Sequence, residues 1–302
     1  MTRSFLIRPL GAFSLRESAV FGFGQRMPVG PRAGPAGDDG FDGVMRLAFC
    51  LDGYTEQVGV ELRQDDGGVH GVVHGTGDLD GIRRQVARCL SLDHDGREFE
   101  AVGRRDPVIG RLQQAAPGLR PPLFYSPYEA AAWSVLSARR PAAQTAQVRT
   151  RLSRAWGRTF ELAGEPLAAL PTPRQLLEVT DFPGIPADRI ERLHGVAQAA
   201  LRGLLDPDRL LRLGPVVATS EVQRIKGIGP FYASLIVIRG TGFSDVLAPD
   251  ESRSLDLIRQ LYGLADLPSP AELEELAEPW RPFRTWCTVL IRAAGRRVLV
   301  SS

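Results

Sequence analysis

The sequence predicts an α+β protein, with a small β-rich α/β unit at residues 1–105 and an all-helical unit at residues 106–302. Two observations indicate this division. Short apolar segments separated by Gly and Asp turns fill the first hundred residues, which is the pattern of strands. From about residue 108 the pattern changes to one helical segment after another. A short connection near residues 104–107 is expected between the two units.

The N-terminal unit contains three apolar segments of strand length. We expect strands at residues 44–51, 58–62 and 69–73. Residues 82–92 instead place Ile82, Val86 and Leu90 on one side of a helix. The run 27–43 is rich in Pro and Gly and is expected to form a loop inside this unit.

Helix starts are recognisable in the second unit. Ser126 precedes Pro127, and Glu129 stands at the capping-box position, so that a helix begins here. Thr172 followed by Pro173 gives a second start of the same kind. Further helices are expected at residues 109–116, 143–156, 187–204, 220–225, 231–239, 250–262, 270–277 and 283–295.

Composition narrows the function classes. Cys50, Cys89 and Cys287 lie far apart in the chain, so neither a zinc site nor an iron–sulfur site of clustered cysteines is expected. They are interpreted as free thiols in a reducing compartment. The chain has no run of about 18 apolar residues and no convincing signal peptide. We therefore expect a cytoplasmic protein without a membrane partner.

The charge is nearly balanced but unevenly spread. Residues 1–105 contain 13 basic and 15 acidic residues, a net charge of −2, and the remainder contains 24 and 20, a net charge of +4. The chain has a single lysine, Lys226, in the more positive part. A weak positive bias of this kind suits a unit that contacts a nucleic-acid backbone.

The most informative motif is the run IKGIGPFYASLIVIRG at residues 225–240. A helix N-terminus offers unpaired backbone N–H groups and a partial positive charge, which suit a phosphate. Gly227 and Gly229 allow close approach of a ligand, and Pro230 fits the first helical position. Together with Lys226 and Ile228 they indicate a site that binds the phosphate backbone of a nucleic acid independently of its base sequence. A glycine turn before a helix is also common as a plain connection, and that alternative stays open.

Three ordered stretches carry a resemblance to a known family. They are residues 222–251, with the hairpin KGIGPFYA and the run DVLAPDE, residues 117–138, and residues 280–292, with WRPFRTWCTVLIR. Over about residues 85–295 the chain resembles the helix-hairpin-helix DNA glycosylase superfamily, and most closely its alkylpurine branch, the bacterial 3-methyladenine DNA glycosylase II type. The resemblance implies a monomeric enzyme that hydrolyses the N-glycosidic bond of alkylated purines flipped out of double-stranded DNA.

The resemblance also places a catalytic carboxylate. The ungapped match puts this acid on Glu251, where the family normally has Asp, and Asp250 precedes it. A carboxylate there stabilises an oxocarbenium-like transition state and orients the attacking water. Three alternatives stay open: Asp250 is the catalytic acid, neither residue is, or either caps the following helix.

Strand-cutting members of the superfamily use a lysine as nucleophile. At the position that resemblance gives for this lysine, the chain has Phe231. A monofunctional hydrolase is therefore expected. The missing cysteine cluster argues against the iron–sulfur endonuclease III branch.

Resemblance places Phe231, Leu235 and Arg292 in the base pocket. Phe231 suits a stacked, cationic base, although an ordinary core aromatic is the alternative. Leu235 and Arg292 stand where aromatics are expected, and an arginine there repels a cationic base.

Two further sets of DNA contacts follow from the resemblance. Pro121 and Leu123 are the candidates for the wedge that fills the gap left by the flipped base. Arg139 and Arg140 end the helix that begins at Pro127 and reach the DNA strand, or else form a solvated helix end.

No cofactor is expected beyond a structural Na⁺ or K⁺ at the hairpin, held by the backbone carbonyls of Gln223, Ile225 and Ile228. The alternative function is a non-catalytic protein that binds lesions or shapes DNA. A third alternative is a hairpin domain used for protein contacts.

Overall fold

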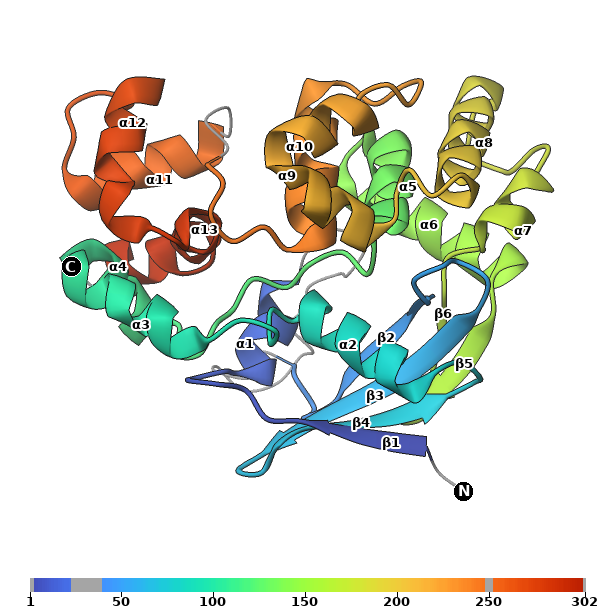
Figure 1. The fold of residues 1–302 in the computed structure, drawn as a ribbon, viewed down its shortest axis with the longest axis horizontal. Coiled ribbons are helices and arrows are strands. Elements are labelled where there is room, and N and C mark those ends of the chain that lie inside the picture. Colours follow the sequence, from blue (N-terminus) through green and yellow to red (C-terminus); the bar gives the residue numbers. More distant parts are fainter. Residues whose placement is uncertain (1–2, 23–39, 248–251, 301–302) are drawn as a thin grey trace.

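The computed structural model describes residues 3–22, 40–247 and 252–300. A small antiparallel sheet forms one end of the molecule, and two groups of helices stand side by side over it (Figure 1). One group contains α3, α4 and α11–α13, and the other contains α5–α10. The predicted mixed class, a sheet with a larger helical part, is confirmed.

The sheet has the order β1-β4-β3-β2, and all its pairs are antiparallel. Alternating valines and leucines, such as Val60 opposite Val73, form its buried face. The three predicted strands are confirmed, and the sheet gains an edge strand at the N-terminus. Its elements are β1 (Arg3–Ile7), α1 (Leu15–Phe21), β2 (Met45–Cys50), β3 (Gln57–Asp65), β4 (Gly68–His74) and α2 (Leu79–Cys89).

The helical part begins earlier than the sequence pattern indicated. Its helices are α3 (Gly96–Arg105), α4 (Pro107–Ala115), α5 (Pro127–Ser137), α6 (Ala142–Trp156), α7 (Pro173–Leu177), α8 (Ala187–Leu201), α9 (Pro207–Val222), α10 (Pro230–Thr241), α11 (Ser252–Tyr262), α12 (Pro270–Leu276) and α13 (Arg284–Val300), with the 3-10 turn η1 (Glu278–Trp280). The prediction missed α3 and all of α9 except its last turn, residues 220–222, and it extended that helix to residue 225, which lies in the turn. Non-helical Gly214 divides α9 into two halves.

The connection near residues 104–107 is shorter than expected. Asp106 ends α3 and caps α4 through hydrogen bonds from the N–H groups of Val108 and Ile109. Phe99 and Val102 of α3 share a core with Trp286 of α13. α3 therefore packs with the helical part, while the unit boundary at residue 105 stays a prediction.

A second small hairpin, β5 (Thr159–Leu162) and β6 (Glu165–Ala168), was not predicted. It packs against β2 and β3 of the sheet. Phe160 lies so close to Gly59 that a β-carbon there would sit 2.8 Å from the Phe160 side chain. The Arg46 guanidinium donates to the Leu162 carbonyl at 3.0 Å, which ties the hairpin to β2.

One buried ion pair joins the sheet to the helices. Glu129 of α5 accepts a hydrogen bond from the backbone N–H of Cys50 in β2 at 3.1 Å and one from Arg149 of α6 at 3.0 Å. Burial raises the pKa of the Glu129 carboxyl, and the positive charge of Arg149 opposes this rise. The pair therefore depends on both partners.

Removing Arg149 is expected to leave an unpaired buried carboxylate. Arg149→Ala should lower the free energy of unfolding by about 3–5 kcal/mol. Arg154→Ala, on the exposed side of the same helix, should change it by less than about 0.5 kcal/mol. Urea denaturation followed by circular dichroism measures both. Equal small losses in the two variants would contradict a structural role for the pair.

Candidate functional site

The glycine motif forms a tight turn between α9 and α10. Ile225 and Ile228 are buried, with 7% and 4% of their surfaces exposed, and they anchor the turn to the helical core. The Ile228 N–H donates to the Ile225 carbonyl at 3.0 Å and closes the turn. Buried isoleucines before and after Gly227 thus fix the position of the loop.

The two glycines have different roles. Gly227 has a φ of 91°, in the left-handed region, and a β-carbon there would lie 2.7 Å from Cδ of Arg192 in α8. Gly229 is the N-cap of α10 and has a φ of −83°, and a β-carbon added to it would meet no atom within 4 Å. Gly227 therefore shapes the turn, whereas Gly229 leaves the space before α10 open. The first N–H groups of α10 offer a site for an anion there.

Lys226 precedes the N-cap Gly229 by three residues and is exposed. Its ammonium group donates to Glu191 of α8 at 2.7 Å, and both side chains are largely open to solvent. An exposed pair of this kind contributes little stability. The lysine is therefore available to exchange Glu191 for a phosphate.

The turn that follows α5 lies next to the hairpin. The Ser137 hydroxyl contacts the Tyr232 hydroxyl of α10 at 3.4 Å. Arg139 is exposed and has a φ of 53°, which is uncommon for a residue with a side chain. Arg189 of α8 holds this turn by donating to the carbonyls of Leu136 and Ala138.

Arg140 is bound within the protein, because it donates to the Gly184 carbonyl at 2.9 Å. Arg139 and Arg140 therefore differ: one side chain projects outward, and the other braces the turn. Arg189 was missed by the sequence interpretation. Its partners lie about fifty residues away in the chain, and no local pattern indicates such a contact.

The expectation for the wedge needs correction. Pro121 and Leu123 are both buried, and only 3% of the Leu123 surface is exposed. Their segment runs between two parts of the protein: the Leu123 N–H donates to Cys89, and the Phe124 N–H donates to Arg239. A wedge has to project from the surface, which neither side chain does here.

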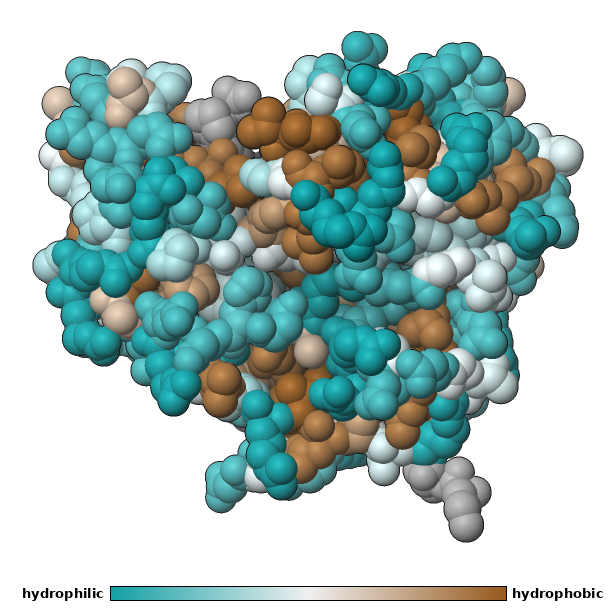
Figure 2. Space-filling view, viewed as in Figure 1, coloured by the Kyte–Doolittle hydropathy of each residue, from teal (hydrophilic) through white to brown (hydrophobic). Residues whose placement is uncertain are grey.

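Phe231 and Leu235 share one face of α10, four residues apart. Phe231 is 57% exposed and meets Tyr232 edge-to-face, with ring centroids 5.4 Å apart. Leu235 is half-buried against the helical core. Phe231 is thus a surface aromatic in this structure rather than a core residue. Hydrophobic side chains gather over α9 and α10 on the face drawn in Figure 2.

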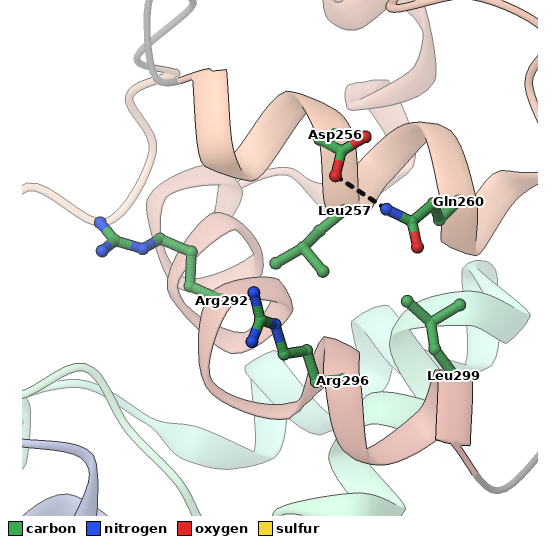
Figure 3. Close-up of a pocket in the computed structure, with 6 residues that line it drawn as sticks. All are labelled: Asp256, Leu257, Gln260, Arg292, Arg296 and Leu299. Carbon is green, nitrogen blue, oxygen red and sulfur yellow. Dashed lines mark hydrogen bonds between the residues drawn. The ribbon is translucent and has the colours of Figure 1, made fainter.

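Arg292 lies on the other group of helices, on α13. It lines a hollow of about 660 Å³ between α11 and α13, together with Asp256, Leu257, Gln260, Arg296 and Leu299. Figure 3 shows Arg296 reaching into the space between the helices, while the Arg292 guanidinium points away from the other labelled side chains. Asp256 accepts a hydrogen bond from Gln260 at 2.8 Å. This side of the site therefore carries two guanidinium groups.

Asp250 and Glu251 lie outside the described residues, but the chain is fixed on both sides of them. Before them, the Thr285 hydroxyl of α13 accepts a hydrogen bond from the Val246 N–H at 2.9 Å and donates one to the Val246 carbonyl at 2.8 Å. After them, α11 begins at Ser252 and packs against α13. The acidic run thus connects two segments that are both bound to α13.

Asp245 strengthens this attachment. Its carboxylate accepts hydrogen bonds from Arg284 at 2.7 Å and from Arg281 at 3.0 Å. Partial burial alone would raise the pKa of Asp245, but the hydrogen bonds and charges of the two arginines outweigh it and hold the pKa below its usual value. The contribution of these pairs is present above the pKa of the unfolded state and is lost as the pH falls through the lowered folded value.

The three residues expected to hold a cation all lie at the turn. Gln223 follows the end of α9, and Ile225 and Ile228 are the buried anchors. The Ile225 carbonyl accepts the Ile228 N–H, and a carbonyl oxygen has a second lone pair for another partner. Oxygen donors of this kind suit a hard monovalent ion. Among the described residues, no group of three or more His, Cys, Asp or Glu side chains is placed to hold a metal.

Comparisons with known proteins agree with this geometry. The chain is 30% identical to DNA-3-methyladenine glycosylase 2 of Escherichia coli over 190 aligned residues. These residues cover 61% of this chain and 63% of that protein. It is 23% identical to the DNA-3-methyladenine glycosylase of Bacillus subtilis over 211 aligned residues, and these cover 68% of this chain and 70% of that protein. No protein-family model matches the chain.

Among solved structures, the 3-methyladenine DNA glycosylase from Archaeoglobus fulgidus has a TM-score of 0.75 at 19% identity, over 97% of this chain and 98% of that one. This likeness shows a shared fold. The chain spans a little under two thirds of the E. coli relative's length. No helix in the described part of the chain has the length and apolar character of a membrane span.

The different roles of the two hairpin glycines can be measured. Gly227→Ala should lower the free energy of unfolding by about 1–2 kcal/mol, because it forces a β-carbon into a left-handed backbone and against Arg192. Gly229→Ala should cost less than about 1 kcal/mol, since its φ is ordinary and its surroundings are open. Thermal and urea unfolding of both variants provide the test, and the reverse order would refute this assignment.

Proposed function

We propose that this chain, which is similar in sequence to two bacterial DNA-3-methyladenine glycosylases, hydrolyses the N-glycosidic bond of alkylated purines in double-stranded DNA. The observation that carries this proposal is the hairpin before α10, with its open N-terminal amides and its close-approach glycine. The curated relatives are named for release of 3-methyladenine, which gives the substrate class proposed here. The activity would initiate base-excision repair in the bacterial cytoplasm, at the nucleoid.

The hairpin would hold the DNA backbone. A phosphate at the N-terminus of α10 would accept hydrogen bonds from N–H groups that have no partner within the helix. The helix dipole would also favour its negative charge. Lys226 adds an ammonium group beside it. Such contacts are independent of base sequence, as repair of scattered lesions requires. A Na⁺ or K⁺ ion on the carbonyls of Gln223, Ile225 and Ile228 would support the turn from the other side.

A base must leave the stack before its bond to the sugar can be cleaved. Flipping costs a few kcal/mol, and least where damage has weakened pairing. Phe231 offers an exposed aromatic face beside the hairpin on which a flipped base can stack, with Leu235 on the same side of α10. Arg139, which projects from the turn after α5, would contact the distorted strand.

The chemical step needs a carboxylate near the sugar. An alkylated purine is already a good leaving group, and the transition state is oxocarbenium-like. Glu251 would stabilise the positive charge that develops on the sugar and orient the attacking water. This proposal is supported by the fixed segments on both sides of the acidic run, residues 244–246 and α11. The enzyme would act as a monomer.

The alternative is a relative that binds damaged DNA without releasing the base. Arg292 favours it, because a guanidinium on α13 opposes a cationic base in the pocket. The glutamate in the place of the usual aspartate favours it as well. Base release distinguishes the two functions, whereas DNA binding alone does not.

Glu251→Gln should reduce release of free bases from methylated duplex DNA by at least about 100-fold, because the amide cannot stabilise positive charge or accept a proton. Duplex affinity should be retained. Asp250→Asn is the matched control and should keep most of the activity. Chromatography of the released bases measures the rate. Full activity of the Glu251→Gln variant would refute the assignment of the acid, and tight binding by an inactive wild type would support the alternative function.

Phe231→Lys should not create a strand-cutting enzyme. A lysine amine acts as a nucleophile only when its pKa is lowered by its surroundings, and position 231 is largely exposed to solvent. Borohydride should therefore trap no covalent complex between this variant and DNA that contains a lesion or an abasic site. A trapped complex would show that the scaffold already supports lyase chemistry.

A further inference from the structure

A groove extends from the hairpin along α8 and α9. Its lining residues come from α8, from both halves of α9 and from the turn before α10, and its volume is about 720 Å³. Lys226 of the hairpin lines one part of it, and Arg202, at the C-terminal end of α8, lines another. Arg224 lies only two residues before Lys226. The groove therefore reaches the hairpin at Ile225 and Lys226, just before the proposed phosphate site.

The charges along this groove are unequal. Four basic residues, Arg202, Arg209, Arg224 and Lys226, line it together with the two acids Glu191 and Glu221. Both acids are paired: Glu191 with Lys226 at 2.7 Å, and Glu221 with Arg209 at 2.6 Å. Arg202 and Arg224 are exposed, and their side chains form no hydrogen bond or ion pair with any described residue. Two positive charges are thus left unopposed.

The spacing of these charges suits an extended polyanion. Glu191 of α8, which pairs with Lys226, and Arg202, which follows the end of α8, are eleven residues apart, and this corresponds to about 16 Å along a helix. A DNA strand advances about 3.4 Å per nucleotide, so this length corresponds to roughly five nucleotides. Arginine binds phosphate oxygens through two parallel N–H groups, which makes it well suited to a backbone contact.

We propose that this groove binds a stretch of DNA backbone that continues from the hairpin, with Arg224 and Arg202 as phosphate contacts. The inference rests on the proposed function and extends it, because it gives the DNA a second set of contacts made by side chains rather than by backbone amides. A positive charge at the end of α8 also interacts favourably with the helix dipole, without any ligand. Binding measurements at different salt concentrations separate the two roles.

The experiment measures the affinity of undamaged duplex DNA at several salt concentrations by fluorescence anisotropy. The slope of log affinity against log salt should fall by about 0.9 for Arg202→Ala or Arg224→Ala, and by about 1.8 for the double variant, with a duplex of about 20 base pairs. Arg202→Lys and Arg224→Lys should keep most of the wild-type slope. Arg63→Ala is the control, because Arg63 is equally exposed but lies on β3 in the sheet, at the other end of the molecule (Figure 1).

The outcomes separate this inference from the function on which it rests. An unchanged slope in the double variant, with normal duplex binding and base release by the wild type, would overturn the groove proposal alone. Failure of the wild type to bind duplex DNA would overturn both proposals. Thermal unfolding of each variant confirms that a changed slope does not come from partial unfolding. A fall in slope for Arg63→Ala equal to that of the groove variants would also contradict a specific groove contact.

Discussion

The burial of α10 is the constraint on which the candidate site depends. Ala233, Ile236 and Val237 are fully buried between α5 and α9. Each fully buried aliphatic side chain of valine or isoleucine size contributes about 1.5–3 kcal/mol. The contact with α5 is close, because a β-carbon on Gly240 would lie 2.9 Å from Cα of Pro127. α10 therefore has one position in the core, and its two ends are fixed with it.

Each end of α10 serves a different part of the proposed function. The N-terminal end carries the hairpin and presents unpaired amides to solvent. At the C-terminal end, Gly242 adopts a left-handed conformation, and the chain crosses to α13, where Asp245 and Val246 are held. A helix of 12 residues is about 18 Å long. The length of one buried helix thus sets the distance between the hairpin before α10 and Gly242, after which the chain leads to Asp245.

The features that the sequence predicted well are those encoded locally. Capping residues, N-terminal prolines and the glycine turn indicated α5, α7 and the hairpin, because each signal acts within four residues of its target. The burial of Leu123 was not predictable, since the backbone at residues 123–124 is held by the carbonyls of Cys89 and Arg239, which are distant in the chain. The β5–β6 hairpin was missed for a similar reason: its strands are short, and the sheet stabilises them. Where Asp250 and Glu251 lie remains a prediction from the sequence.

If the proposed function holds, the charge of Arg292 bears on which bases the site would accept. Two unit charges about 4 Å apart repel by about 4 kcal/mol at the effective dielectric of a protein surface, and by only about 1 kcal/mol in water. Arg292 is half-buried and lines the hollow between α11 and α13, where its guanidinium points away from the other labelled side chains (Figure 3). Asp250 and Glu251 directly precede α11 in the sequence, and their carboxylates carry the opposite charge. Under the proposed function, a cationic base would be tolerated only if these acids lay closer to it than Arg292, whereas a neutral lesion would face no such condition. The position of this one guanidinium would therefore shift the balance between cationic and neutral lesions, separately from the contacts that the hairpin would make with the DNA.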